Sequence, residues 1–234
     1  MRLPEFSAYS PARLLRARPA AAEQALLDIE PPPLFLDAHV RPGQFCRLRV
    51  HDVEGIFAML SGPGEAPRFL VRIDGPEGAA ADALAALEDG APIEMTQPAG
   101  EGFGLERARG RDVRFVATGT GIAPVCAAME HVLRERAAYK TISLDHGLRS
   151  EAHLAIGPEI ERWRDAGVEV RLAYSRVDES SNLVGMSVQD SLRAAVTSLA
   201  GAALVCVGQL EMLASVRELV GELGGDPDAI LTNI

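Results

Sequence analysis

A change of pattern near residue 110 constrains the fold of this chain more than any other feature. After Gly110, the sequence repeats a unit of apolar strand, glycine-containing turn and amphipathic helix. Such alternation indicates a parallel sheet covered on both faces, because each helical crossover must return over the sheet. The expected strands are 113–117, 141–144, 168–173, 203–207 and 230–231, separated by helices at 124–136, 158–166, 188–195 and 212–223. The second part is therefore predicted to be a five-stranded parallel α/β domain.

The residues before this change read as short strands broken by proline and glycine. Turn residues such as Pro42-Gly43 and Gly62-Pro63-Gly64 separate the apolar runs. The expected strands are 14–17, 24–29, 45–50, 56–61, 69–73 and 93–96, with one helix at 79–87. Many short strands at this spacing predict an antiparallel Greek-key barrel. We therefore expect an all-β domain at 1–108 and an α/β domain at 109–234.

Composition excludes several classes of protein. The net charge of −10 and the presence of one lysine, Lys140, argue against a nucleic-acid binder, which needs clustered basic residues. Three widely spaced cysteines (Cys46, Cys126 and Cys206) form no C-x-x-C pair, and the histidines form no ligand cluster, so no metal site is expected. Without a signal peptide or an apolar run of about 20 residues, we expect a cytoplasmic protein with no membrane insertion.

The most informative motif follows the strand at 113–117. Two glycines let the backbone turn tightly, and free N–H groups at the start of the next helix attract a pyrophosphate. The candidate nucleotide-binding residues are Gly119, Thr120, Gly121, Ile122, Ala123 and Pro124. An ordinary glycine-rich turn is the alternative interpretation of this segment alone. Asp145, in the next strand region, is a candidate ribose-binding acid.

With this motif the sequence resembles the ferredoxin–NADP reductase superfamily, whose nucleotide loop reads Gly-Thr-Gly-x-Ala-Pro. Further segments match in the same order along the chain. They are Arg41-Pro42-Gly43-Gln44-Phe45, Gly102-Phe103, His146-Gly147-Leu148-Arg149, Ser175-Arg176 and Gly208-Gln209-Leu210-Glu211-Met212. The resemblance covers residues from about 12 to 234. It implies an FAD-binding barrel, an NAD(P)-binding α/β domain and hydride transfer from NAD(P)H to FAD.

The resemblance also implies site residues in both domains. The expected flavin-binding residues are Phe57, Ala58, Met59, Arg72, Gly78, Ala81 and Ile234. Besides the loop at 119–124, the expected NAD(P)-binding residues are Gly147, Arg149, Ser175, Arg176, Gly208, Gln209 and Met212. No catalytic acid or base is expected, because the cofactors carry the chemistry of hydride transfer.

Several positions depart from the family pattern. The flavin motif Arg-x-Tyr-Ser corresponds to Gly55-Ile56-Phe57-Ala58, which lacks the charge and the hydroxyl. Arg72 is a candidate replacement for the missing arginine, and an exposed arginine on a sheet face is the alternative. The family cysteine beside the nicotinamide corresponds to Val207, so Cys206 is expected to point into packing. The preference between NADH and NADPH stays open.

Because of these departures, the sequence is compatible with more than one function. The main hypothesis is an NAD(P)H oxidoreductase that passes electrons from FAD to a redox partner protein or a small-molecule acceptor. A second hypothesis is a nucleotide-binding regulatory or scaffold subunit of a larger complex that has lost flavin-dependent turnover. A third is a dehydrogenase without flavin that uses Asp145, but it leaves the Pro-Gly-Gln-Phe turn unexplained.

Overall fold

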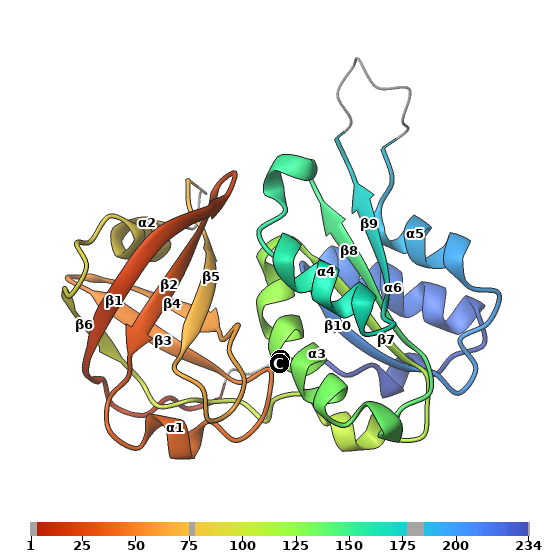
Figure 1. Ribbon diagram of the computed structural model, residues 1–234, viewed down its shortest axis with the longest axis horizontal. Coiled ribbons are helices and arrows are strands. Elements are labelled where there is room, and N and C mark those ends of the chain that lie inside the picture. The colour runs from red at the N-terminus through yellow and green to blue at the C-terminus, as the bar shows by residue number, and fades with distance from the viewer. Residues whose placement is uncertain (1–3, 75–77, 177–184, 234) are drawn as a thin grey trace. The chain divides into compact units, whose positions relative to one another are not determined.

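The computed structural model describes residues 4–74, 78–176 and 185–233. The chain divides into two compact units. The first comprises Met1–Phe103, Ala123–His131 and Asn233–Ile234, and the second comprises Gly104–Ile122 and Val132–Thr232. Each unit has its own sheet (Figure 1). The domain boundary at 108/109 stays a prediction.

The first unit is built on a six-stranded antiparallel sheet with the order β4-β3-β6-β1-β2-β5. Its strands are β1 (Ser10–Ala21), β2 (Gln24–Glu30), β3 (Phe45–Val50), β4 (Val53–Ala58), β5 (Arg68–Arg72) and β6 (Pro92–Met95). The two ends of this order approach each other, since the Leu60 N–H donates to the Arg68 carbonyl at 2.8 Å. The sheet is therefore barrel-like, which confirms the predicted all-β class.

Alternation along the strands fills the interior of this barrel. On β3, Cys46 and Leu48 point inward, and their partners on β4 are Phe57 and Gly55. Side chains directly opposite each other in an antiparallel pair lie on the same face, so Phe57 and Gly55 also face the core. The short helix α2 (Ala79–Ala85) packs on this core through Ala81 and Leu84. A second short helix, α1 (Phe35–Ala38), was not expected.

The second unit has a four-stranded parallel sheet with the order β10-β7-β8-β9. Its strands are β7 (Val113–Thr118), β8 (Ile142–Leu148), β9 (Glu169–Tyr174) and β10 (Ala203–Val207). The prediction of a fifth strand at 230–231 was wrong. Leu231 forms only an isolated parallel bridge to Val205, and pairing at one residue is too short to make a strand.

The helices of the predicted α/β pattern are all present. They are α3 (Ile122–Arg134), α4 (Gly157–Asp165), α5 (Val188–Ala195) and α6 (Leu210–Glu222). Helices α5 and α6 bury their apolar side chains, including Leu192 and Val216, against the sheet residues Val116, Leu204 and Cys206. Helix α5 begins with a capping box, in which Ser187 and Asp190 satisfy each other's main-chain N–H groups.

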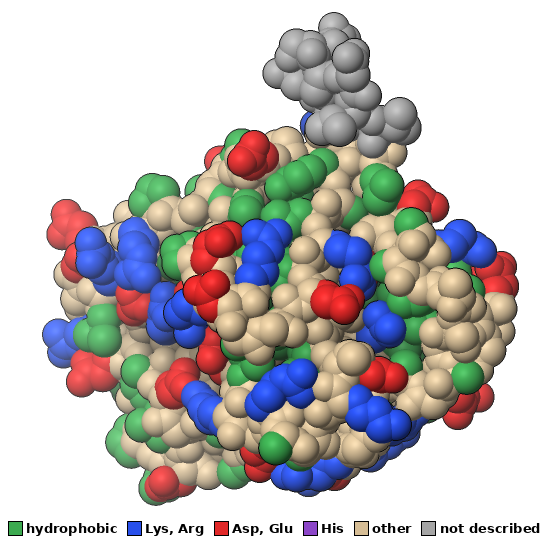
Figure 2. All heavy atoms as spheres, turned by 45° about the vertical axis from the view of Figure 1, so that its right-hand side comes forward, with side chains coloured by type: hydrophobic (Ala, Val, Ile, Leu, Met, Phe, Trp, Pro, Cys, Tyr) green, Lys and Arg blue, Asp and Glu red, His purple; other side chains and the backbone are tan. Residues whose placement is uncertain are grey.

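Acidic and basic side chains lie interspersed on the face shown in Figure 2. Such mixing agrees with the acidic composition acting as a solubilising surface. Within the described ranges 4–74, 78–176 and 185–233, no helix is long and apolar enough to cross a membrane.

Candidate nucleotide-binding site and flavin-binding face

The carboxyl ends of β7, β8 and β10 are neighbours in the parallel sheet of the second unit. In open α/β sheets, ligands bind at this edge, because the turns that follow the strands lie there side by side. The turn after β7 contains Gly119 and Gly121, β8 ends near Gly147, and Gly208 follows β10. The structure therefore brings three of the predicted NAD(P)-binding segments to one sheet edge.

Gly208 after β10 and Gly147 within β8 both lie close to Thr118, the last residue of β7. A Cβ atom added at Gly208 would collide with Thr118 Oγ1 and Met212 Cε. A Cβ atom at Gly147 would lie 3.0 Å from Thr118 Cγ2 and 3.1 Å from Val188 Cβ. Both positions therefore need glycine, because the turns approach each other too closely for a side chain. Thr118 was not singled out from the sequence, although it lies within the recognised motif.

The turn after β7 has the geometry of an anion site. Gly119 adopts a φ of +52°, and a Cβ atom added there would meet nothing within 4 Å. Residues Gly119–Gly121 form a single 3₁₀ turn that leads into α3 at Ile122. No side chain caps the start of either the 3₁₀ turn or α3, which leaves main-chain amides at this point available to an anion. Pro124 lies in the first turn of α3, where its missing N–H costs little.

The diphosphate of a nicotinamide dinucleotide fits this edge. A Cβ atom added at Gly119 would meet nothing within 4 Å, whereas the space at Gly208 and Gly147 is filled by neighbouring side chains. The turn at Gly119 is therefore the part of this edge where main-chain amides can reach phosphate oxygens. The predicted residues Ala123 and Pro124 are buried in α3 and shape the turn.

The structure removes Asp145 from the list of ligand-binding candidates. Its side chain is fully buried and accepts two hydrogen bonds from Arg171, at 2.8 and 2.7 Å, and one from Ser191 Oγ at 2.7 Å. These bonds use both carboxylate oxygens and raise the pKa of the Arg171 guanidinium. The expectation that Asp145 binds a ribose was therefore wrong, since the carboxylate ties β8 to β9 and α5.

The next residue, His146, is a feature that the sequence did not reveal. Its ring is 1% exposed, and Nε2 lies 3.2 Å from the Gly119 carbonyl oxygen. Among the described residues, Nδ1 has no hydrogen-bond partner. Burial lowers the pKa of His146 to about 4, so the ring stays neutral near pH 7. A histidine within the segment that matches the family pattern was the available signal, although it is also compatible with simple packing.

The predicted residues after β8 and β9 lie next to each other. The Ser175 N–H donates to the Leu148 carbonyl at 2.9 Å, and the Arg176 N–H donates to the Arg149 carbonyl at 2.8 Å. Ser175 and Arg176 are exposed, and Arg149 is half-buried. A guanidinium at this rim suits a 2′-phosphate or a diphosphate.

The segment after β10 contains both exposed and buried residues among those predicted to bind NAD(P). Gln209 is exposed at the start of α6, whereas Met212 is buried with its sulfur 3.9 Å from Cys206 Sγ. Cys206 lies in the core beneath α6, as strand alternation predicted, and burial raises the pKa of its thiol to about 12. This thiol is therefore not a nucleophile, since the thiolate is the reactive form.

On the first unit, the predicted flavin residues of β4 do not all face the same way. The Phe57 ring lies over Gly55, where an added Cβ atom would be 2.7 Å from the ring, and it packs edge-on against Phe69 with centroids 6.5 Å apart. The ring therefore occupies the space that a side chain at position 55 would need. Ile56 and Ala58 lie on the outer face of the strand.

The other predicted flavin residues differ in their access to a ligand. Met59 and Ala81 are buried in the barrel core, so neither offers a side chain to a ligand. Gly78 precedes α2, whose seven residues provide few aligned dipoles. Arg72 is exposed, with a long contact of 3.7 Å to Glu23. Ile234 lies outside the described residues. Among the described flavin residues expected from the sequence, Arg72 therefore carries the guanidinium, whereas β4 offers no positive charge.

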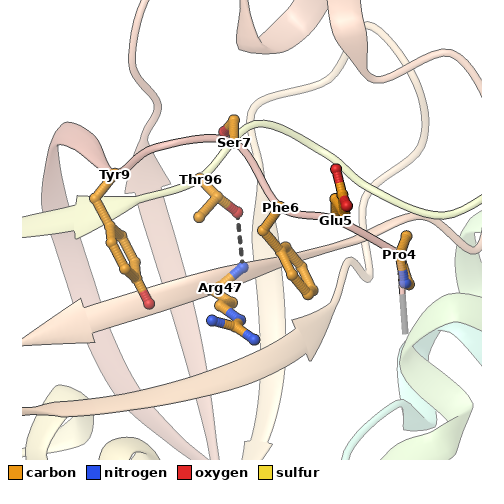
Figure 3. A pocket seen from close by; sticks show the side chains of 7 residues that line it. All are labelled: Pro4, Glu5, Phe6, Ser7, Tyr9, Arg47 and Thr96. Carbon is orange, nitrogen blue, oxygen red and sulfur yellow. Dashed lines mark hydrogen bonds between the residues drawn. The ribbon is translucent and has the colours of Figure 1, made fainter. Parts of the chain in front are cut away.

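A separate hollow of about 350 Å³ lies on the first unit (Figure 3). Its lining is Pro4, Glu5, Phe6, Ser7, Tyr9, Arg47 and Thr96. The Arg47 guanidinium lies 4.4 Å from the centre of the Phe6 ring, and the Arg47 N–H donates to Thr96 Oγ1 at 3.0 Å. None of the residues predicted from the sequence lines this hollow. Its contacts fix the segment before β1 on the outer face of β3.

Comparison with known proteins agrees with this geometry. The family of the oxidoreductase NAD-binding domain matches residues 115–218. Ferredoxin–NADP reductase B of Sorangium cellulosum (strain So ce56) is 31% identical over 186 residues, 74% of each chain. The electron transfer subunit of dihydroorotate dehydrogenase B from Clostridium acetobutylicum is 34% identical over 90 residues, 37% of this chain and 35% of that protein.

Among solved structures, a ferredoxin NADP+ reductase from Neisseria gonorrhoeae with bound FAD and NADP superimposes with a TM-score of 0.79. The match has 18% sequence identity and covers 97% of this chain and 98% of the other, which shows that the fold is shared over both units. Together with the relative from Sorangium cellulosum, these matches identify the chain as a member of the ferredoxin–NADP reductase superfamily of FAD- and NAD(P)-binding oxidoreductases.

Proposed function

We propose that this chain oxidises NAD(P)H with the help of bound FAD and delivers the electrons to a separate acceptor. The observation that carries the proposal is that the Gly119 turn, Gly147 of β8 and Gly208 after β10 lie together around Thr118 at the carboxyl edge of the parallel sheet. Main-chain amides at this edge bind the dinucleotide diphosphate, and the chain supplies position and electrostatics. FAD, when bound, supplies the hydride acceptor.

In this proposal Arg72 holds the FAD diphosphate on the first unit. It carries the only guanidinium among the flavin residues expected from the sequence, and its exposed position lets it turn toward a ligand. The acceptor is a separate protein or small molecule, because the described residues contain no group of side chains that could hold a metal cluster. Buried thiols also favour the cytoplasm as the compartment, where they remain reduced.

Arg149 and Arg176 are proposed to contact the phosphates of the nicotinamide nucleotide. Their main chains adjoin at the ends of β8 and β9, and Arg176 is exposed there. If Arg176 binds a 2′-phosphate, Arg176→Ala weakens NADP⁺ binding about tenfold or more and leaves NAD⁺ binding unchanged. Arg217→Ala, which removes an exposed arginine paired with Asp228, is the control. An unchanged ratio of the two affinities would reject this role for Arg176.

The visible spectrum of the purified protein tests the proposal as a whole. A yellow protein, or one that turns yellow with added FAD, is expected to bleach when NADH or NADPH is titrated in without oxygen. A flavin-loaded protein that neither nucleotide bleaches would refute hydride transfer.

A second candidate function is a nucleotide-binding regulatory or scaffold subunit without flavin turnover. The observation that favours it is the Phe57 ring folded over Gly55, which leaves β4 without the charge of the family motif. The relative from Clostridium acetobutylicum is itself a subunit of a larger enzyme, as its name states. A colourless protein that binds NAD(P)H but takes up no added FAD would support this candidate over the reductase.

A further inference from the structure

One buried side chain from another strand contacts the 3₁₀ turn that opens the nucleotide site, in addition to the Ile122 N–H that donates to the Gly119 carbonyl within the turn. His146 is on β8, beside Ala117 of β7, and its Nε2 reaches over to the Gly119 carbonyl oxygen at 3.2 Å. A carbonyl oxygen can only accept, so Nε2 carries the hydrogen and donates. Nδ1 is then the bare nitrogen, and among described residues no donor reaches it.

Because the peptide unit is planar, the direction of the Gly119 carbonyl also fixes the direction of the next N–H group, that of Thr120. In a trans peptide, the C=O of one residue and the N–H of the following residue point in opposite directions. The Gly119 carbonyl points at His146, inside the second unit, so the Thr120 N–H points away from the ring. A Cβ atom added at Gly119 would meet nothing within 4 Å, so the backbone of this turn is not covered by a side chain at that point.

We propose that His146 is a positioning residue that holds the Gly119–Thr120 peptide with the Thr120 N–H toward the diphosphate of the bound nucleotide. No side chain caps the start of this turn, and the left-handed φ of Gly119 gives its backbone more freedom than other residues have. The bond from His146 adds to the Ile122 N–H bond to the same carbonyl and limits that freedom before the ligand arrives, which reduces the ordering cost of binding. This role rests on the proposed binding of NAD(P)H at the same edge.

The neutral ring suits the role. Burial keeps the pKa of His146 at about 4, so at neutral pH the ring carries one N–H and no charge. That N–H is on Nε2, the atom that faces the turn. A glutamine side chain carries an amide N–H at a similar reach, whereas leucine fills the volume without a donor.

The test compares His146→Leu with His146→Gln in the full-length protein, using two probes. ADP-ribose carries the diphosphate and adenosine does not. His146→Leu is expected to bind ADP-ribose about threefold to tenfold more weakly, the range for one neutral hydrogen bond, with adenosine affinity unchanged. His146→Gln is expected to retain most of the affinity for ADP-ribose. His39→Leu, which removes a buried histidine of the first unit, is the matched control and leaves both affinities unchanged.

Equal ADP-ribose affinity in His146→Leu and the wild type would overturn the proposal, as would a parallel loss for both probes. A nitrogen NMR experiment on the wild type covers the case in which the leucine variant does not fold. It is expected to show the hydrogen on Nε2 of His146 and a large shift of the Thr120 amide on addition of ADP-ribose. A Thr120 amide that does not respond would overturn it. Wild-type protein that binds neither NAD⁺, NADP⁺ nor ADP-ribose would instead refute the proposed function.

Discussion

At the scale of single residues, glycine is needed at different positions of the sheet edge for different physical reasons. Gly119 needs its backbone conformation, since its φ is +52° and the space around it is open. Gly208 needs its lack of a side chain, because Met212 and Thr118 close on it from two sides. The sequence motif marks both positions as glycine but does not distinguish these causes, which depend on residues from other strands and helices.

Replacement of Gly208 by alanine tests the second cause. The added methyl group would force Met212 and Thr118 to move, which is expected to cost about 1 to 3 kcal/mol of folding free energy and to weaken nucleotide binding. Urea unfolding and titration with NADP⁺ measure the two effects. Gly157→Ala is the control, because the methyl group there meets nothing within 4 Å. A Gly208→Ala protein that is as stable as Gly157→Ala would contradict this account.

Arg72 is the residue on which flavin affinity is proposed to depend. Arg72→Ala is expected to weaken FAD binding by about 1.5 to 3 kcal/mol, the value of a hydrogen bond to a charged group. Fluorescence titration of the apoprotein with FAD measures the loss. Arg13→Ala, which removes another exposed arginine of the first unit, provides the comparison. If the two variants bind FAD with the same affinity, Arg72 does not hold the diphosphate.

At the scale of elements, the sequence predicts strands best where their apolar runs are continuous. The strand Ala203–Val207 was predicted to the residue, and so was the helix Val188–Ala195. Strand β8 was predicted to end at Leu144 but continues to Leu148. Its extra residues include Asp145 and His146, which are polar in the sequence and buried only because Arg171, Ser191 and Gly119 provide partners.

The face of a strand was harder to predict than its existence. The strand at 56–61 was expected from the apolar run there, but β4 lies at Val53–Ala58. The residues after Ala58 remain apolar because Met59 enters the barrel core after the strand has ended. Short alternating segments do not fix which residue pairs with which on the neighbouring strand. The orientation of Phe57 toward the core therefore became clear only from its pairing with Cys46.

The buried network of Asp145, Arg171 and Ser191 joins three elements of the second unit. Arg171→Leu would leave the Asp145 carboxylate buried without its cation, which is expected to cost about 3 to 5 kcal/mol of folding free energy. Arg164→Leu, which breaks an exposed pair with Glu161, is expected to cost less than about 1 kcal/mol. Urea unfolding measures both. Equal losses in the two variants would show that Asp145 finds another partner or takes up a proton at little cost.

At the scale of the whole molecule, buried neutral histidines make stability depend on pH. Burial lowers the pKa of His146 to about 4 from an ordinary value of 6.5, and it also lowers the pKa of His39. Well above pH 6.5 both rings are neutral in the folded and the unfolded chain, so their contribution to stability is complete there. As the pH falls from 6.5 to 4, the unfolded chain binds protons that the folded chain does not, and stability decreases.

His146 alone is expected to account for about 3 kcal/mol of this loss between pH 6.5 and 4, because one pKa unit corresponds to about 1.36 kcal/mol. His146→Gln cannot take up this proton, so its free energy of unfolding is expected to fall less steeply over the same range. Urea unfolding of both proteins at several pH values gives the difference, from which the contributions of His39 and the carboxylates cancel. Parallel curves would mean that His146 is protonated in the folded protein as readily as in the unfolded chain, and that its ring is not held neutral beside Gly119.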